Sequence, residues 1–202
     1  MDYSDFTLNI IREKLGIENR RTPILTDFKA LQPSDNLIKE LNEVEELPIR
    51  SEKAKSEWIV VPILKELRNR NNKFFTIYSG DTLLADEEKG LKGECDFILA
   101  KDIGTFDINY PIIQIVEAKK NDVEIGVPQC AAQLIGAKIY NNKKRVDLDV
   151  IYGCVTTGNE WLFMLLENDC IKINTKLYYL NEIDNVLGIF QQIIDYYINE
   201  LK

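Results

Sequence analysis

The chain has 202 residues, 45% hydrophobic and 29% charged, a composition typical of a globular protein that can bury a full core. Its net charge of −8 excludes a surface that attracts nucleic acid everywhere, so any such contact must be local or shared with a metal or a partner. The absence of histidine excludes serine–histidine catalysis, papain-like cysteine catalysis and the common zinc modules. Hydrolytic chemistry would then depend on carboxylates, a hard metal ion and lysine.

Targeting signals are not visible in the sequence. The N-terminal residues lack a basic stretch followed by an apolar one, and no apolar run is long enough to span a bilayer. Four widely spaced cysteines form no C-x-x-C pair, which is typical of reduced thiols. We therefore expect a cytoplasmic protein with no membrane partner.

The first third of the chain predicts helices. Residues 3–15 and 34–44 have apolar positions at helical spacing after the candidate caps Ser4 and Ser34, with a loop at residues 20–23 between them. Residues 51–70 predict a strong amphipathic helix, kinked by Pro62. Its expected apolar stripe consists of Ala54, Trp58, Val61, Leu64 and Leu67.

The remaining two thirds alternate between strands and helices. A strand at residues 74–78 leads into a long polar loop over 79–93, and strands follow at 94–99 and 112–120 with a loop around 104–110. A helix is predicted from Pro128 to about residue 140, then a hairpin of strands 149–156 and 160–167, and a short strand at 171–173. The last helix covers residues 181–201. No repeat or linker is visible, so we expect a single domain over residues 1–202, with a helical extension over residues 1–50.

Charged side chains interrupt two of these strands. Asp96 lies in the apolar strand 94–99, and Glu117 and Lys119 lie at the end of strand 112–120. Because side chains alternate along a strand, Glu117 and Lys119 project to the same side. If the two strands are neighbours, Asp96 joins them, and two carboxylates and an ammonium meet at one point. This combination suits metal-assisted hydrolysis of a phosphodiester.

The order of elements and these residues resemble the PD-(D/E)XK nuclease superfamily over residues 51–167. Asp96 matches its first strand carboxylate, and Glu117-Ala118-Lys119 matches its E-x-K element. The first-helix glutamate corresponds to Glu57, and Gln129 and Gln133 match the glutamine that some branches carry in the following helix. Cys95 stands where the name-giving proline would be. The nearest likeness is to the nuclease domain at the start of type I restriction motor subunits and to small stand-alone relatives.

The resemblance implies a fold and a set of roles. The fold would be α/β, a restriction-endonuclease-like core with a central mixed β-sheet flanked by helices in αβββαβ order and extra N- and C-terminal helices. Mg²⁺, with Mn²⁺ as a substitute, would be held by Asp96, Glu117, the Ala118 carbonyl and Glu57. The expected catalytic residues are Asp96, Glu117, Lys119, Glu57, Gln133 and Gln129. Lys119 would orient the attacking water or stabilise the phosphorane, and at least one of the two glutamines would point at Lys119, the water or a phosphate.

Other interpretations stay open at this stage. Asp96, Glu117 and Lys119 can form a structural ion pair, and Glu57 can be a solvated helix residue of the kind expected for Glu52. The function expected is a metal-dependent nuclease acting on DNA, with RNA left open, either as a homodimer or in a larger restriction or repair assembly. The alternative is a catalytically silent nuclease-fold module that binds nucleic acid or a protein partner. A metal-dependent phosphoesterase acting on small molecules is a third hypothesis.

Overall fold

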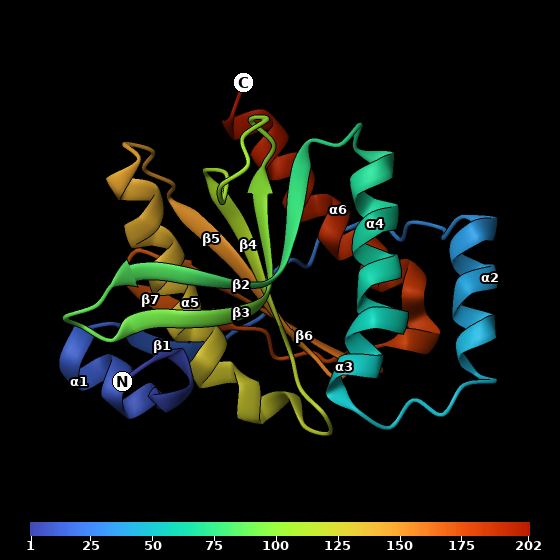
Figure 1. Ribbon diagram of the computed structural model, residues 1–202, viewed down its shortest axis with the longest axis horizontal. Helices are drawn as coiled ribbons and strands as arrows, with labels where there is room; N and C mark the ends of the chain where they lie inside the picture. The colour runs from blue at the N-terminus through green and yellow to red at the C-terminus, as the bar shows by residue number, and fades with distance from the viewer.

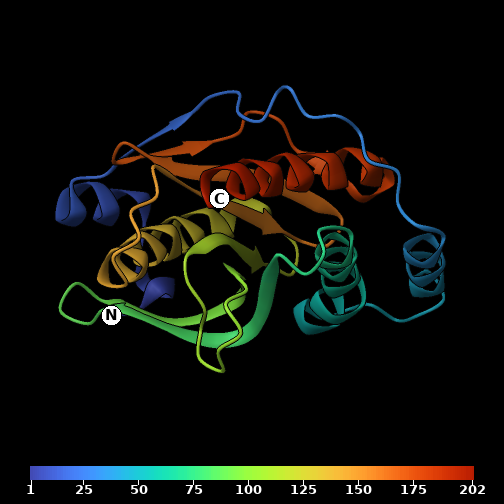
Figure 2. The same ribbon diagram turned by 90° about the horizontal axis from the view of Figure 1, so that it is seen from above.

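The computed structural model describes all 202 residues and contains a mixed eight-stranded β-sheet. The strands lie in the order β1-β7-β6-β5-β4-β3-β2, and β8 pairs with β6 beside this path. Helix α5 covers one face of the sheet and α6 the other, as Figure 1 and, more clearly, Figure 2 show. The predicted α/β class, with a mixed sheet flanked by helices, is therefore confirmed. No helix is long and apolar enough to cross a membrane.

The elements have the following bounds. The strands are β1 (Glu18–Arg21), β2 (Phe75–Asp86), β3 (Leu91–Lys101), β4 (Ile112–Ala118), β5 (Val150–Thr156), β6 (Glu160–Glu167), β7 (Cys170–Ile173) and β8 (Tyr178–Tyr179). The α-helices are α1 (Leu8–Leu15), α2 (Asp35–Val44), α3 (Glu52–Lys55), α4 (Val61–Arg70), α5 (Val123–Lys143) and α6 (Ile183–Glu200). Short turns of other helical types are η1 (Tyr3–Asp5), η2 (Ser56–Val60) and η3 (Leu180–Glu182).

Strand β4, which carries Glu117, is buried along its whole length. It pairs antiparallel with β3 on one side and parallel with β5 on the other. A strand covered on both faces needs apolar side chains at almost every position, which explains the run of isoleucine and valine in β4. The strands of Asp96 and Glu117 are neighbours, so the condition on which their meeting depends is fulfilled.

Strands β2 and β3 form one long hairpin, with pairs from Phe75 opposite Lys101 to Asp86 opposite Leu91. The predicted polar loop over residues 79–93 is therefore wrong. Residues 79–82 are polar or glycine because they are exposed on the edge strand of the sheet, where solvent replaces a neighbouring strand. The two strands bend together, so the far half of the hairpin turns toward α5 (Figure 1).

The helix predicted at residues 51–70 forms, but a π turn (η2) interrupts it between α3 and α4. A π turn holds more residues than an α turn, so the buried face shifts along the sequence. Trp58 is 51% exposed, whereas the following residues Ile59 and Val60 are buried, so the apolar stripe predicted through Trp58 is wrong. Pro62 lies in the first turn of α4, directly after the departure from the α-helical hydrogen-bond pattern.

Helix α5 begins earlier than its sequence suggests. It begins at Val123, because the Asp122 side chain accepts a hydrogen bond from the Glu124 N–H at 2.8 Å and caps the helix. Pro128, predicted as the first residue, lies inside the helix. A proline there removes only its own hydrogen bond to the preceding turn, and the buried packing of α5 against β4 and β5 tolerates that loss.

The N-terminal segment also differs in detail from the prediction. The helix expected at residues 3–15 is divided into η1 and α1, which are capped by Asp2 and Thr7 rather than by Ser4. The cap at Ser34 is confirmed, since its hydroxyl accepts from the Leu37 N–H at 3.2 Å. Strand β1 forms where a loop was expected and pairs parallel with β7 at the edge of the sheet.

The C-terminal half agrees with its prediction. Strands β5 and β6 form the expected antiparallel pair, β7 follows, and α6 ends the chain. The ring of Phe190 on α6 lies edge-on to Phe163 and Trp161 of β6, with ring centroids 5.1 and 5.8 Å apart. One cluster of 54 buried residues extends from Tyr3 to Tyr197, so the N-terminal turn and the last helix share a core.

Candidate active site

The pairing of β3 with β4 brings the first two predicted site residues together. Phe97 is opposite Val116, so the next step along this antiparallel register puts Asp96 opposite Glu117. The Ala118 N–H donates a hydrogen bond of 2.7 Å to Asp96 Oδ2, which fixes that carboxylate at the end of β4. Asp96 is half-buried, so one side of the pair remains accessible.

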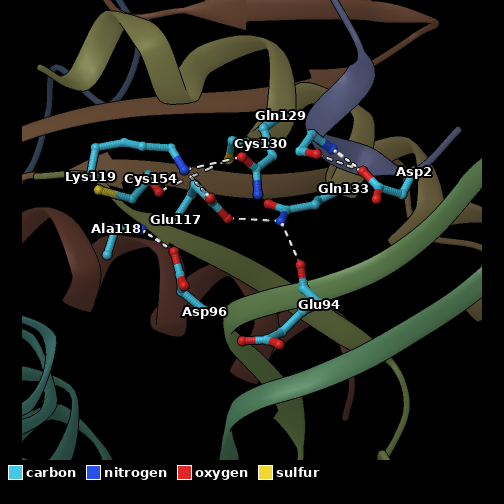
Figure 3. A network of polar contacts seen from close by, with 11 residues as sticks. Asp2, Glu94, Asp96, Glu117, Ala118, Lys119, Gln129, Cys130, Gln133 and Cys154 are labelled. Carbon is cyan, nitrogen blue, oxygen red and sulfur yellow. Dashed lines mark hydrogen bonds and ion pairs between the residues drawn. The ribbon is translucent and has the colours of Figure 1, made fainter. Parts of the chain in front are cut away.

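Glu117 is the buried charged group of this site, with only 1% of its surface exposed. Its two oxygens accept hydrogen bonds from two sides (Figure 3): Oε1 from Lys119 Nζ at 2.6 Å and Oε2 from Gln133 Nε2 at 2.8 Å. Burial and the nearby charge of Asp96 raise the pKa of Glu117 to about 7, although Lys119 and Gln133 act in the opposite direction. The protein therefore keeps a carboxylate at a position where its ionised form is costly.

Lys119 follows β4 and reaches back over Glu117. Its N–H donates to the Thr156 carbonyl at 2.8 Å, and its Nζ also donates to Gln129 Oε1 at 3.0 Å. Burial disfavours the ammonium, but the negative charges of Glu117 and Asp96 outweigh it and raise the pKa of Lys119. Lys119 thus stays protonated at neutral pH and is a hydrogen-bond donor rather than a base.

Close approach of α5 depends on Gly126. A Cβ added there would lie 2.5 Å from Val155 Cγ1 and 2.9 Å from Lys119 Cγ. Real side chains do not come so close, so the absence of a side chain at this position lets the lysine lie against the helix.

Gln129 and Gln133 lie four residues apart on one face of α5, and both reach the site as predicted. Gln133 is fully buried, and its Nε2 bonds Glu117 and approaches the Glu94 carbonyl at 3.5 Å. Gln133 Oε1 has no hydrogen-bond partner in the protein. An unpartnered buried oxygen is costly, and Gln114 of β4 likewise has no partner for either of its amide atoms.

Glu57 is the predicted site residue that the structure does not bring to this group. Its side chain is 55% exposed and pairs with Lys53 Nζ at 3.7 Å. No hydrogen bond or ion pair connects Glu57 with Asp96, Glu117 or Lys119.

Glu52, interpreted from the sequence as a solvated residue, acts on the site through its charge. It is half-buried, and its charge is among the causes that raise the pKa of Lys119. Sequence reasoning missed it because the π turn changes which residues of this helix face the sheet. The proline at position 62 was the available signal of such a change.

The helix is also fixed to the loop that follows Lys119. Lys55 Nζ donates a hydrogen bond of 2.5 Å to the Lys120 carbonyl, while the Lys120 side chain is exposed, as expected from strand alternation. Helix α3 is therefore tied to the loop that connects β4 with α5.

The donor set fits a hard divalent cation. Asp96 and Glu117 are opposed carboxylates whose mutual repulsion a cation would relieve, and Mg²⁺ needs few protein ligands because it keeps several waters. No group of three or more Asp, Glu or Cys side chains is spaced to hold a metal ion. Backbone oxygen, such as the Ala118 carbonyl predicted as a ligand, and water would have to complete the coordination.

Comparisons with known proteins add no family to this description. No protein-family model matches the chain, and neither the curated proteins nor the solved structures contain a match.

Proposed function

We propose that this protein is a metal-dependent nuclease that hydrolyses phosphodiester bonds, with DNA as its substrate and Mg²⁺ as its metal. The observation that carries the proposal is the convergence of Asp96, Glu117 and Lys119 at the end of β4, held by Gln129 and Gln133. Buried charged groups are rarely retained without a role, and this set combines metal ligands with a donor for a phosphate oxygen.

The chain's own residues would divide the work. Asp96 and Glu117, with the Ala118 carbonyl, would hold the metal, which when bound supplies an acidified water and neutralises charge on the phosphorus. Gln133 and the buried wall of β4 keep the Glu117 carboxylate in one orientation. Lys119, oriented by Gln129, donates to the attacking water or to a phosphate oxygen in the transition state. Glu52, rather than Glu57, is the carboxylate of the flanking helix best placed to assist.

A second candidate function rests on one observation. Both oxygens of Glu117 already have protein partners, as in a structural ion pair, which favours a silent module that binds nucleic acid or a protein partner. Metal binding distinguishes the enzyme from the silent module. Only the enzyme needs Lys119 to release Glu117 Oε1, so that this oxygen can bind the metal.

The deciding experiment is a cleavage assay with Mg²⁺ or Mn²⁺ on single-stranded, duplex and branched DNA and on RNA, with wild type beside Asp96→Asn. We expect cleavage by wild type alone and a calorimetric metal-binding signal that Asp96→Asn loses. Absence of both cleavage and metal binding in wild type would refute the enzyme and favour the silent module.

A further inference from the structure

A large groove lies beside the candidate active site. Its volume is about 1120 Å³, and it runs between α2, the segment after α2, the α3–η2 helix and the β8–η3 segment. This volume exceeds the roughly 300–1,000 Å³ typical of sites for one small molecule. An extended ligand therefore fits it better than a compact one.

Lys55 connects the groove with the loop that follows the end of β4. Lys55 lines the groove, and its Nζ bonds the carbonyl of Lys120, the residue after Lys119. Asn159, in the turn between β5 and β6, also lines it, and the neighbouring Gly158 packs against Lys55 and Ile59. A chain whose phosphate lies at Lys119 can therefore continue past Lys55 into the groove.

The lining matches the faces and edges of nucleobases rather than a row of phosphates. Ten of the seventeen lining residues are apolar, and Tyr179 among them is 44% exposed, so its ring is available for stacking. Amide side chains, which can pair with base edges, are supplied by Asn42, Asn159 and Asn181. The charges balance, since Glu45 and Glu182 offset Lys55 and Lys176.

The net charge of the chain also favours contacts with bases over contacts with a row of phosphates. A protein of net charge −8 gains little from general attraction to phosphates, so local contacts, including contacts with bases, have to supply its affinity for nucleic acid. Bases in a duplex are paired and stacked on one another, and only an unpaired strand offers their faces to an apolar groove.

We propose that this groove binds the unpaired strand of the substrate next to the cleaved phosphodiester, with Tyr179 as a stacking platform. The inference rests on the proposed nuclease function and specifies its substrate class as single-stranded nucleic acid or a duplex with a single-stranded extension. Lys176 and Lys55 would contact the few phosphates of that strand.

The test is fluorescence anisotropy of labelled oligonucleotides in EDTA, which prevents metal-dependent cleavage. The probes are a single strand, the blunt duplex of the same sequence and that duplex with a single-stranded extension. We expect wild type to bind the single strand and the extended duplex at least about tenfold more tightly than the blunt duplex. The salt dependence should be shallow, because the charges of the groove balance and few phosphates are contacted. Tyr179→Ala should weaken single-strand binding about tenfold.

The matched control is Phe106→Ala, which removes a fully exposed aromatic ring in the β3–β4 loop outside the groove. It should leave binding of every probe unchanged, and circular dichroism should show both variants folded. Equal affinity of Tyr179→Ala and wild type for the single strand, or tighter binding of the blunt duplex, would overturn the proposal. A third result would also overturn it: wild type sediments as a dimer, and Tyr179→Ala sediments as a monomer but still binds the single strand. The groove would then be a self-association surface.

Failure of this inference is separable from failure of the nuclease function. Metal-dependent cleavage with no effect of Tyr179→Ala keeps the enzyme and removes the groove from its substrate path. Tyr179-dependent strand binding without any cleavage keeps the groove and removes the enzyme.

Discussion

The two faces of the central sheet are built on different principles. On the α6 face, Phe190 packs edge-on against Trp161 and Phe163, all fully buried and without a charge. On the α5 face, at the end of β4, Glu117 is buried with Lys119 and a glutamine whose oxygen has no partner. The aromatic cluster of the first face stabilises the fold, whereas the buried ion pair of the second costs stability.

The largest expected effect is a loss of stability on the α6 face. Phe190→Ala leaves a cavity beneath β6 and should lower the free energy of unfolding by about 3–5 kcal/mol. Denaturant unfolding followed by circular dichroism measures this. Because the site lies on the other face, cleavage per folded molecule should not change. A parallel loss of activity in the folded fraction would show that the faces are not independent.

The next prediction addresses the polar face. Lys119→Met should reduce cleavage by about a thousandfold, equivalent to about 4 kcal/mol in the activation barrier, because the donor at the reacting phosphate is lost. The fold should persist, since Glu117 can take up a proton when its partner is removed. Lys120→Met, at the neighbouring exposed lysine, is the matched control and should change the rate less than threefold. Similar losses in both variants would show that only the local positive charge matters.

A smaller effect concerns stability against pH in the absence of metal. The pKa of Glu117 is about 7 in the folded protein, above the 4.5 of a free glutamate, so the folded state retains the proton longer than the unfolded state. Stability contributed by this group should therefore fall as pH rises from about 4.5 to about 7 and then level off.

The comparison is with Glu117→Gln, which cannot titrate. Thermal unfolding from pH 4 to 8 should show a wild-type melting temperature that falls relative to the variant across this window. Parallel curves would contradict the assignment of the raised pKa to Glu117.

The smallest expected effect distinguishes the two glutamates of the flanking helix. Glu52→Gln should lower the cleavage rate about tenfold, since the Glu52 charge acts on Lys119, whereas Glu57→Gln should change it less than twofold. Both substitutions conserve size, so kcat and KM can be compared directly. The reverse order would restore Glu57 as the site residue.

Strand alternation and apolar patterning were enough to predict much of this structure. The two strands that carry Asp96 and Glu117, the β5–β6 pair and the last helix all follow from such local signals, although the pairing of the first two strands does not. The polar half of the β2–β3 hairpin did not, because an exposed edge strand has the composition of a loop. Strand β1 depends on pairing with β7, more than a hundred residues away, and has no signal of its own.

The site residues likewise differ in whether local sequence spacing predicts them. Residues next to one another on β4, and glutamines four apart on α5, keep their spacing in any regular element, so Glu117, Lys119 and Gln133 were predictable. The prediction of Glu57 depends on its match to the first-helix glutamate of the resembled superfamily. The π turn breaks the regular helix expected over residues 51–70, and Glu52 is the carboxylate of this helix whose charge contributes to the raised pKa of Lys119.

The geometry of the site is unusually sensitive to the size of the residue at position 126, which is a glycine. It has no functional group, yet the room it leaves against Val155 and Lys119 decides where the ammonium can lie. A single methyl group at this position would act on the lysine through steric exclusion alone. The geometry of the charged cluster can thus be adjusted from the neighbouring helix without altering any of the charges, which makes position 126 a control point for design.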